Sequence, residues 1–214
     1  MLPTTLEEIA NYIVADGKGI LAADESTGTI EKRFKSIDVE STEENRRKYR
    51  EMLFRSSAMT EAIGGVILFD ETLRQNAADG TPLREIILSQ KSLPGIKVDQ
   101  GVQSFNGSNI EKTTQGLDGL DERCKEYDRL GAKFTKWRAV INIWDSIPSN
   151  DCISDNMISL AKYASIAQQN NMVPIVEPEV IMDGNHSIDQ CYDVTKNVLL
   201  KLFDLLEKEN VSIK

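Results

Sequence analysis

Ionisable side chains lie in or directly beside the short apolar runs of this chain, where buried β-strands are expected. In a parallel sheet covered on both faces, an ionised side chain within a strand is costly unless it is paired or used. The carboxyl ends of parallel strands are also where α/β enzymes place their chemistry, so the group as a whole predicts an active site. For any one residue, an ion pair that seals the sheet or a strand end in water explains the charge equally well. The seven residues are Asp24, Lys97, Asp99, Lys136, Arg138, Glu177 and Glu179.

Residues two apart on a strand share a face, and this spacing joins several of the charged residues. Lys136 and Arg138 are such a pair. A lysine beside another cation has a destabilised ammonium group, which lowers its pKa toward the range in which it acts as a base or a nucleophile. Two adjacent carboxylates, such as Glu177 and Glu179, can have pKa values that are pushed apart, so that one accepts a proton while the other donates one.

Two kinds of ligand are compatible with this charged set. Lys97, Lys136 and Arg138, on converging strands, would form a pocket for an anion such as a phosphorylated substrate. A divalent cation, Mg²⁺ or Mn²⁺, is the alternative, because hard cations take carboxylate oxygens, although the lysines would repel it. Its candidate ligands are Asp24, Asp99, Glu177 and Glu179. Loss of activity with EDTA would favour the metal, whereas borohydride trapping with a carbonyl substrate would favour a lysine imine.

Composition narrows the class of protein further. The chain has 214 residues and a formal net charge of −9, so non-specific attraction to nucleic acid or to an anionic membrane is not expected. No apolar run is long enough to span a bilayer, and the N-terminus lacks the pattern of a secretory signal. Three scattered cysteines favour a reducing compartment, most simply the cytoplasm. A single histidine, His186, excludes mechanisms that need two histidines and most zinc enzymes.

Apolar runs typical of strands alternate with helical periodicity along the whole chain. Strand followed by helix, with short connections, predicts a parallel sheet flanked by helices, either a (β/α) barrel or a doubly wound sheet. No Pro/Ser-rich linker and no repeat interrupts this pattern, so residues 1–214 are expected to form a single domain. The strands are expected at 17–24, 64–69, 94–99, 134–143 and 171–180.

Capping-box spacings predict where several helices start. The three pairs are Thr5 with Glu8, Ser41 with Glu44 and Ser187 with Gln190. Further helices are expected at 83–90, 120–131 and 157–170, and the polar segment 103–116 is expected to be a loop. The apolar positions that the last helix is expected to turn inward are Ile188, Cys191, Val194, Val198, Leu202 and Leu205.

Seven strings spread over nearly the whole sequence carry a family resemblance. They are GKGILAADEST (17–27), STEENRRKYR (41–50), IGGVILFDETL (63–73), GIKVDQG (95–101), TTQGLDGLDERCKEY (113–127), FTKWRAV (134–140) and VPIVEPE (173–179). In this order they closely resemble class I fructose-1,6-bisphosphate aldolase. The resemblance implies an eight-stranded TIM (β/α)8 barrel, of which this sequence holds about the first five β/α units.

The resemblance also implies an activity. The family reversibly cleaves fructose 1,6-bisphosphate to glycerone phosphate and glyceraldehyde 3-phosphate in glycolysis and gluconeogenesis. Cleavage proceeds through a lysine Schiff base, without a metal or another cofactor. Complete enzymes of the family are homotetramers, so the implied partners are a phosphorylated sugar and further copies of the same subunit, with no nucleic acid and no membrane.

Matched position by position, the resemblance implies a role for each candidate site residue. Asp24 resembles the acid near the substrate C4 hydroxyl, and Lys136 resembles the lysine that supports carbinolamine chemistry and binds substrate. Glu177 resembles the general acid/base of imine formation, and Glu179 resembles the carboxylate that holds the active-site lysines in place. The residues that resemble positions lining the site or contacting phosphate and hydroxyl groups are Ser26, Arg33, Arg46, Lys97 and Arg138.

Three of these matches have a simpler explanation from the residues alone. Arg33 and Arg46 lie in polar, helical segments, where a solvated helix face accounts for them. Ser26 and its neighbour Thr27 could equally be helix caps, although helix N-termini also bind phosphate.

The sequence also departs from the family. The imine-forming lysine of the family lies on the sixth strand, beyond the part represented here, as do later phosphate-binding residues and a C-terminal tail; Lys214 does not correspond to that lysine. Five strands leave barrel edges and apolar interior open, so the 214-residue chain by itself is expected to have low solubility and little or no aldolase activity. The alternative function is a catalytically inactive form that binds full-length subunits.

Overall fold

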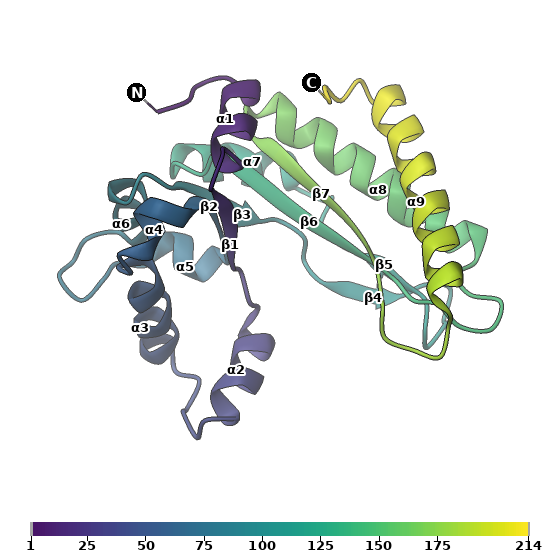
Figure 1. Ribbon diagram of the computed structural model, residues 1–214, viewed down its shortest axis with the longest axis horizontal. Helices are drawn as coiled ribbons and strands as arrows, with labels where there is room; N and C mark the ends of the chain where they lie inside the picture. The colour runs from purple at the N-terminus through teal and green to yellow at the C-terminus, as the bar shows by residue number, and fades with distance from the viewer. Residues whose placement is uncertain (1, 214) are drawn as a thin grey trace. The chain divides into compact units, whose positions relative to one another are not determined.

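The computed structural model describes residues 2–213. Its contacts divide the chain into two compact units. The first unit comprises the residues up to Lys97 together with Glu126–Thr135, and the second comprises Val98–Lys125 together with the residues from Lys136 onward. Figure 1 shows the helices and strands of both units under the labels used below.

Three parallel strands form the centre of the first unit. β1 and β2 pair in parallel, as do β2 and β3, so each crossover carries helices between neighbouring strands. Five of the six residues of β2 are buried, as expected for a strand covered on both faces. The elements are α1 (Leu6–Ile13), β1 (Gly19–Ala23), α2 (Thr27–Lys35), α3 (Glu43–Phe54), α4 (Ala58–Ala62), β2 (Ile63–Leu68), α5 (Asp70–Arg74), α6 (Leu83–Ser89) and β3 (Leu93–Lys97).

Glycines allow an aromatic ring to pack directly on the strands of the first unit. The ring of Phe134, which is fully buried, lies against β2 at Gly65 and against β3 at Gly95. A Cβ atom at Gly95 would overlap this ring, so no larger residue fits there without a shift of the ring. Gly65 and Gly95 therefore leave the space that the Phe134 ring fills in the core of this unit.

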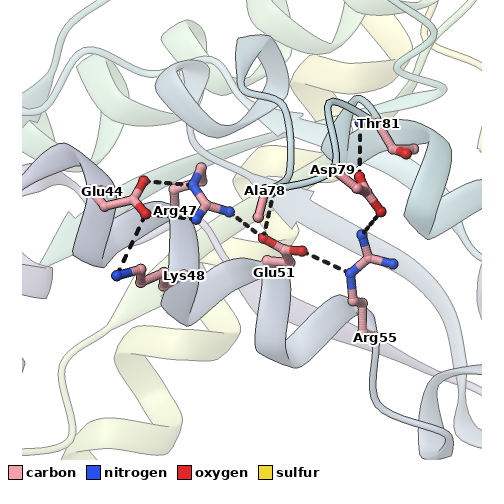
Figure 2. Close-up of polar contacts among 8 residues, drawn as sticks. All are labelled: Glu44, Arg47, Lys48, Glu51, Arg55, Ala78, Asp79 and Thr81. Carbon is pink, nitrogen blue, oxygen red and sulfur yellow. Dashed lines mark hydrogen bonds and ion pairs between the residues drawn. The ribbon is translucent and has the colours of Figure 1, made fainter.

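Surface ion pairs fasten α3 to the segment that follows α5. Glu51 accepts a hydrogen bond from the backbone N–H of Ala78 at 3.2 Å, and Arg55 contacts both Glu51, at 2.8 Å, and Asp79, at 2.7 Å (Figure 2). The backbone N–H of Thr81 and the guanidinium of Arg55 lower the pKa of Asp79 to about 2. These contacts help to fix the position of α3, which carries Arg46 and Arg50.

Long helices accompany the strands of the second unit. Trp137 of β6 stacks on Tyr163 of α8 with ring centroids 5.4 Å apart, and both side chains are fully buried. α8 and α9 pack side by side, as the green and yellow helices of Figure 1 show. The elements are β4 (Val102–Ser104), β5 (Lys112–Thr114), α7 (Leu120–Arg129), β6 (Phe134–Ile141), α8 (Asn150–Gln169), β7 (Val173–Val180) and α9 (Ile188–Lys208); α7 and β6 also contribute residues to the first unit.

Strand order decides between the two sheet types that the sequence left open. The main sheet has the order β1-β2-β3-β6-β7, which follows the chain without reversal. A doubly wound sheet reverses its order at a switch point, whereas a (β/α) barrel adds each strand beside the previous one. The fold is therefore α/β of the barrel type, with five of the strands of a TIM barrel present.

Most expected strands and helix starts are confirmed. The capping boxes at Thr5 and Ser187 are present, and the expected helix 120–131 is α7, after which Gly131 adopts φ +94°. The cap expected at Ser41 is wrong by one residue, because Thr42 accepts the hydrogen bond from the Asn45 N–H.

Three further expectations differ from the structure. The polar segment 103–116 contains most of the antiparallel hairpin β4–β5. α8 begins at Asn150 rather than at 157, since the side chain of Ser149 caps its first turn by accepting a hydrogen bond from the Cys152 N–H. Ile188, expected to point inward, is 85% exposed, although Val198 and Leu202 of the same helix are buried.

Candidate functional site

The first unit places two of the predicted site residues at one edge of its sheet. Ala23, Leu68 and Ile96 lie side by side in a row across β1, β2 and β3. Asp24 follows Ala23, and Lys97 follows Ile96, so both lie one residue beyond this row, at the carboxyl ends of the strands. Two strand spacings separate them, roughly 10 Å between backbones. This distance leaves room for a ligand to contact both side chains.

A buried network of arginines and glutamates lies behind this edge. Arg50 of α3 is fully buried and donates to the backbone carbonyl of Glu25 at 2.7 Å, directly after Asp24 in the chain. Its guanidinium also lies 3.8 Å from the Glu25 carboxylate and 3.7 Å from that of Glu71. Burial lowers the pKa of Arg50, while the two glutamates act in the opposite direction. The network therefore anchors the backbone that carries Asp24 to α3.

Two of the predicted phosphate-contacting arginines also join this network. Arg46 forms a two-pronged pair with Glu71, at 2.8 and 2.6 Å, and its side chain is only 11% exposed. These hydrogen bonds lower the pKa of Glu71 below its usual value. Arg33 pairs with Glu25 and is 59% exposed. Arg33 thus lies on a solvated helix face, as the simpler explanation expected, whereas Arg46 does not.

Ser26 directly precedes α2 and occupies its N-cap position. Its hydroxyl makes no capping hydrogen bond and instead lies 3.1 Å from the hydroxyl of Thr29. The backbone carbonyl of Ser26 accepts from the N–H groups of Thr29 and Ile30. The side chain is therefore not committed to closing the helix.

The second unit pairs each predicted cation with a predicted carboxylate. Lys136 and Arg138 lie on the half-exposed face of β6, whereas Trp137 between them is buried on the opposite face. The Nζ atom of Lys136 lies 3.0 Å from Oε2 of Glu177. Arg138 forms an ion pair with Glu179. Lys136 and Arg138 therefore share one face of β6, and this expectation is confirmed.

Asp99 lies at the same end of this unit but belongs to no strand. Its carboxylate accepts from the N–H of Gly101 at 3.2 Å and, at the long limit of 3.5 Å, from the N–H of Arg138. The expected strand to 99 therefore ends two residues earlier, at Lys97. Asp99 helps to order the loop that follows β3.

This arrangement limits the chemistry of the second unit. Lys136 contacts Glu177 directly, and Arg138 contacts Glu179, so each carboxylate pairs with a different cation. Lys136 is 13% exposed and Glu177 is 36% exposed, so a ligand can reach the pair from solvent. A lysine and a carboxylate 3.0 Å apart can exchange a proton directly.

Glu25, Arg50 and Glu71 are the site-building residues that sequence reasoning missed. A weak signal was present, because Glu25 and Glu71 each follow an apolar strand closely, as Asp24 does. Arg50 gave no signal, since its helix contains several arginines and lysines that look alike in sequence. Within residues 2–213, no group of three or more His, Cys, Asp or Glu side chains is arranged to hold a metal ion.

Comparison with known proteins agrees with the barrel-type fold. The fold is similar to that of a fructose-bisphosphate aldolase from Plasmodium falciparum, solved in complex with TRAP and a small-molecule inhibitor: the TM-score is 0.93 at 48% identity, over 96% of this chain and 60% of that one. The family model for class-I fructose-bisphosphate aldolase matches residues 5–214. The chain belongs to the class-I fructose-bisphosphate aldolase family.

Curated relatives give the same family. The chain is 52% identical over 209 residues to a probable fructose-bisphosphate aldolase class 1 of Xanthomonas axonopodis pv. citri, and 52% identical over 210 residues to fructose-bisphosphate aldolase C of Carassius auratus. Each match covers 98% of this chain but only 63% and 58% of the relative, respectively. The chain thus spans about three fifths of the length of these relatives.

Proposed function

We propose that this chain forms part of the substrate site of an enzyme that reversibly cleaves fructose 1,6-bisphosphate to glycerone phosphate and glyceraldehyde 3-phosphate. Family membership supports the reaction. The observation that carries the proposal is the contact between Lys136 and Glu177, whose Nζ and Oε2 atoms lie 3.0 Å apart in a partly exposed pair. Carbon–carbon cleavage through a lysine imine needs such a pair, because forming the imine requires loss of water from a carbinolamine.

In this proposal the residues of the second unit handle protons. Glu177 donates a proton to the carbinolamine hydroxyl as water leaves, and takes one back when the imine is hydrolysed. Lys136 stabilises the charge that develops on the substrate during these steps. Glu179 keeps Arg138 in place, and Arg138 is then positioned to contact a phosphate or hydroxyl group.

The residues of the first unit bind and polarise the substrate. Asp24 acts on the proton of the C4 hydroxyl, whose loss accompanies cleavage of the bond between C3 and C4. Lys97, at the same sheet edge, supplies positive charge for an anionic substrate, which the net charge of −9 would otherwise repel. The remaining candidate contacts to phosphate and hydroxyl groups are Ser26, Arg33 and Arg46. In Arg33 and Arg46 this role requires exchange of their present glutamate partners.

The imine-forming lysine of the proposed enzyme lies outside this sequence. We therefore propose that the 214-residue chain by itself is inactive, and that a cytoplasmic, homotetrameric complete enzyme carries out the reaction without a metal or another cofactor. Within residues 2–213, no helix is long and apolar enough to cross a membrane.

Two preparations test this proposal. The purified 214-residue chain is expected to show no cleavage of fructose 1,6-bisphosphate in an assay coupled to NADH oxidation. A chimera that joins it to the uncovered part of the Xanthomonas relative is expected to cleave the sugar. EDTA should leave that rate unchanged, and borohydride with substrate should abolish it. A folded but inactive chimera would contradict the proposed reaction, and cleavage by the chain alone would contradict its dependence on outside residues.

Variants of the chimera test the role of the central pair. Lys136→Met is expected to lower kcat by about 10²-fold or more, the usual effect of removing a group that stabilises developing charge. The matched control is Lys133→Met, just before the same strand, whose side chain is 38% exposed and pairs with Asp128. Equal rates for the two variants would count against Lys136.

A non-catalytic role is the second candidate. In it, the short chain binds full-length subunits of the same family. The observation that favours it is the exposure of large apolar side chains on α9, among them Ile188, Leu200 and Phe203. An intact-mass measurement on the native product separates the candidates: a longer chain supports the enzyme, and a stable 23.9 kDa species bound to full-length subunits supports the binding role.

A further inference from the structure

A polar pocket lies between two loops of the second unit. The loops are 142–149, between β6 and α8, and 181–187, between β7 and α9; both helices begin at the lower right of Figure 1. The pocket has a volume of about 230 Å³. Since a water molecule takes up about 30 Å³ of liquid, this is room for roughly seven waters or for the end of one long side chain. The lining residues, none of which belongs to the aldolase site described above, are Ile143, Trp144, Asp145, Asn185, His186 and Gln190.

The loop after β6 holds an exposed tryptophan in a fixed position. The backbone N–H of Trp144 donates to the carbonyl of Ile147 at 3.1 Å, and the N–H of Ile147 donates to the carbonyl of Trp144 at 3.0 Å. Asp145 and Ser146 form the tight turn between them, in which Ser146 adopts φ +60°. Trp144 is 56% exposed, whereas the other tryptophan of the chain, Trp137, is fully buried. The indole of Trp144 is therefore available to a ligand as a rigid aromatic surface.

The loop after β7 forms the other side of the pocket. The N–H of Ile181 donates to the carbonyl of Ile141 at 2.9 Å, which joins this loop to the end of β6. Gly184 lies directly against His186, because a Cβ atom at Gly184 would be 2.9 Å from Nδ1 of the imidazole. This Nδ1 atom is buried and has no hydrogen-bond partner among the described residues. An unmade hydrogen bond at a buried nitrogen costs free energy, so the stability of the loop alone does not explain its conformation.

The charges around the pocket have one sign. Asp145 is the only lining side chain among the described residues that carries a full charge at neutral pH. Neither loop contains a lysine or an arginine, and Asp183 adds a second carboxylate. The first turn of α9 carries Asp189, whose charge offsets the partial positive charge of the helix N-terminus. The local field, like the net charge of −9, therefore attracts a cation and repels an anion.

We propose that this pocket binds a guanidinium group, presented by an arginine side chain of a peptide. The planar group stacks on the indole of Trp144 and donates two N–H groups to the carboxylate of Asp145. The amide oxygen of Asn185 accepts a third. A guanidinium combines a flat face for stacking with a fork of donors that matches a carboxylate, whereas the ammonium of lysine is a compact charge without such a face. Trp144 and Asp145 are neighbours on one turn, so a single group can contact both.

Binding of small arginine analogues to the 214-residue chain tests this proposal. The probe is N-acetyl-arginine N-methylamide, whose only charge is the guanidinium. A saturable change in tryptophan fluorescence is expected, and it should come from Trp144 because Trp137 is buried. The citrulline analogue has nearly the same shape but a neutral urea group, so it should bind about tenfold more weakly or worse. The lysine analogue should also bind more weakly, since it cannot stack.

Variants locate the binding site. Asp145→Asn should weaken binding of the arginine probe by about tenfold or more, because it removes the charge from the hydrogen-bond acceptor. Trp144→Ala should also weaken it, measured by calorimetry. The control is Asp193→Asn, which removes the same charge from an exposed position of α9 outside the pocket and should bind as the unchanged chain does. All three positions are exposed, so folding is expected to be retained, and circular dichroism checks this.

Several results would overturn the inference. They are no binding by the folded, unchanged chain, equal binding of the arginine and citrulline probes, and equal weakening by Asp145→Asn and Asp193→Asn. Tighter binding of the lysine probe would overturn the assignment to a guanidinium. The inference does not rest on the proposed aldolase reaction, because it is tested by binding alone and at residues that have no part in that reaction. A chimera that fails to cleave fructose 1,6-bisphosphate would therefore contradict the reaction and not this site.

Discussion

At the scale of single residues, charge pairing holds the candidate site residues of each unit in place. Arg46 and Arg50 hold Glu71 and the backbone after Asp24, and Lys136 holds Glu177. A buried arginine with two glutamates is weak evidence for stability in itself, since desolvation offsets much of the attraction. Its clearer consequence is positional, because the carbonyl of Glu25 is tied to α3.

The pairing of Glu71 with Arg46 predicts a pH dependence of stability. The pKa of Glu71 is lower in the folded chain than in the unfolded one, where it is about 4.3. The stabilisation is therefore complete above about pH 5 and is lost as the pH falls through the folded pKa. Glu71→Gln should lower the free energy of unfolding by about 1.5–3 kcal/mol at pH 7, the range for hydrogen bonds to charged groups.

Urea unfolding of the unchanged chain and of Glu71→Gln, measured from pH 7 to pH 3, checks this expectation. The difference between the two should be constant down to about pH 5 and should then shrink. Glu44→Gln is the control, since Glu44 also pairs with arginine but is exposed and should contribute little. A difference that grows toward low pH would have the wrong sign for this pair.

At the scale of elements, close packing decides what each strand tolerates. Gly95 of β3 touches the ring of Phe134, whereas Gly28 in α2 has no atom within 4 Å of the position of a Cβ. Gly95→Ala is therefore expected to lower the free energy of unfolding by about 1–3 kcal/mol through overpacking. Gly28→Ala should leave it unchanged or raise it by about 0.5–1 kcal/mol, because alanine is the better helix former.

Thermal and urea unfolding of both glycine variants measures the contrast. Equal stability of the two would show that Phe134 can move aside without cost, and the close contact would then not constrain β3.

Local sequence predicts some elements well and others not at all. Helices with a clear cap and apolar periodicity, such as the one after Ser187, begin where expected, because backbone capping is a local interaction. The hairpin β4–β5 gave no signal, since Thr113 and Thr114 are polar and become buried only by bonding to Asp155 and to the carbonyl of Arg138. Those partners are distant in the sequence.

At the scale of the whole molecule, charge and apolar surface compete. The sequence has an isoelectric point of about 4.8, and large apolar side chains of α9, among them Leu200 and Phe203, are exposed. Repulsion between like-charged chains fades as the net charge approaches zero, so solubility of the 214-residue chain is expected to be lowest near pH 4.8. Turbidity and soluble concentration measured from pH 4 to pH 8 check this. A minimum near pH 7 would instead point to attraction unrelated to net charge.

The sequence alone determined the alternation of strands and helices, the sharing of faces along β6 and the charged residues at strand ends, because these follow from local periodicity and the cost of burying charge. Tertiary structure decided the rest. The order β1-β2-β3-β6-β7 chose a barrel over a doubly wound sheet, and only packing brought Lys136 to Glu177 and Arg50 to Glu25. Tertiary structure also decided that Ile188 is exposed. The pattern of a helix shows which residues are apolar, but it does not show which neighbouring element covers them.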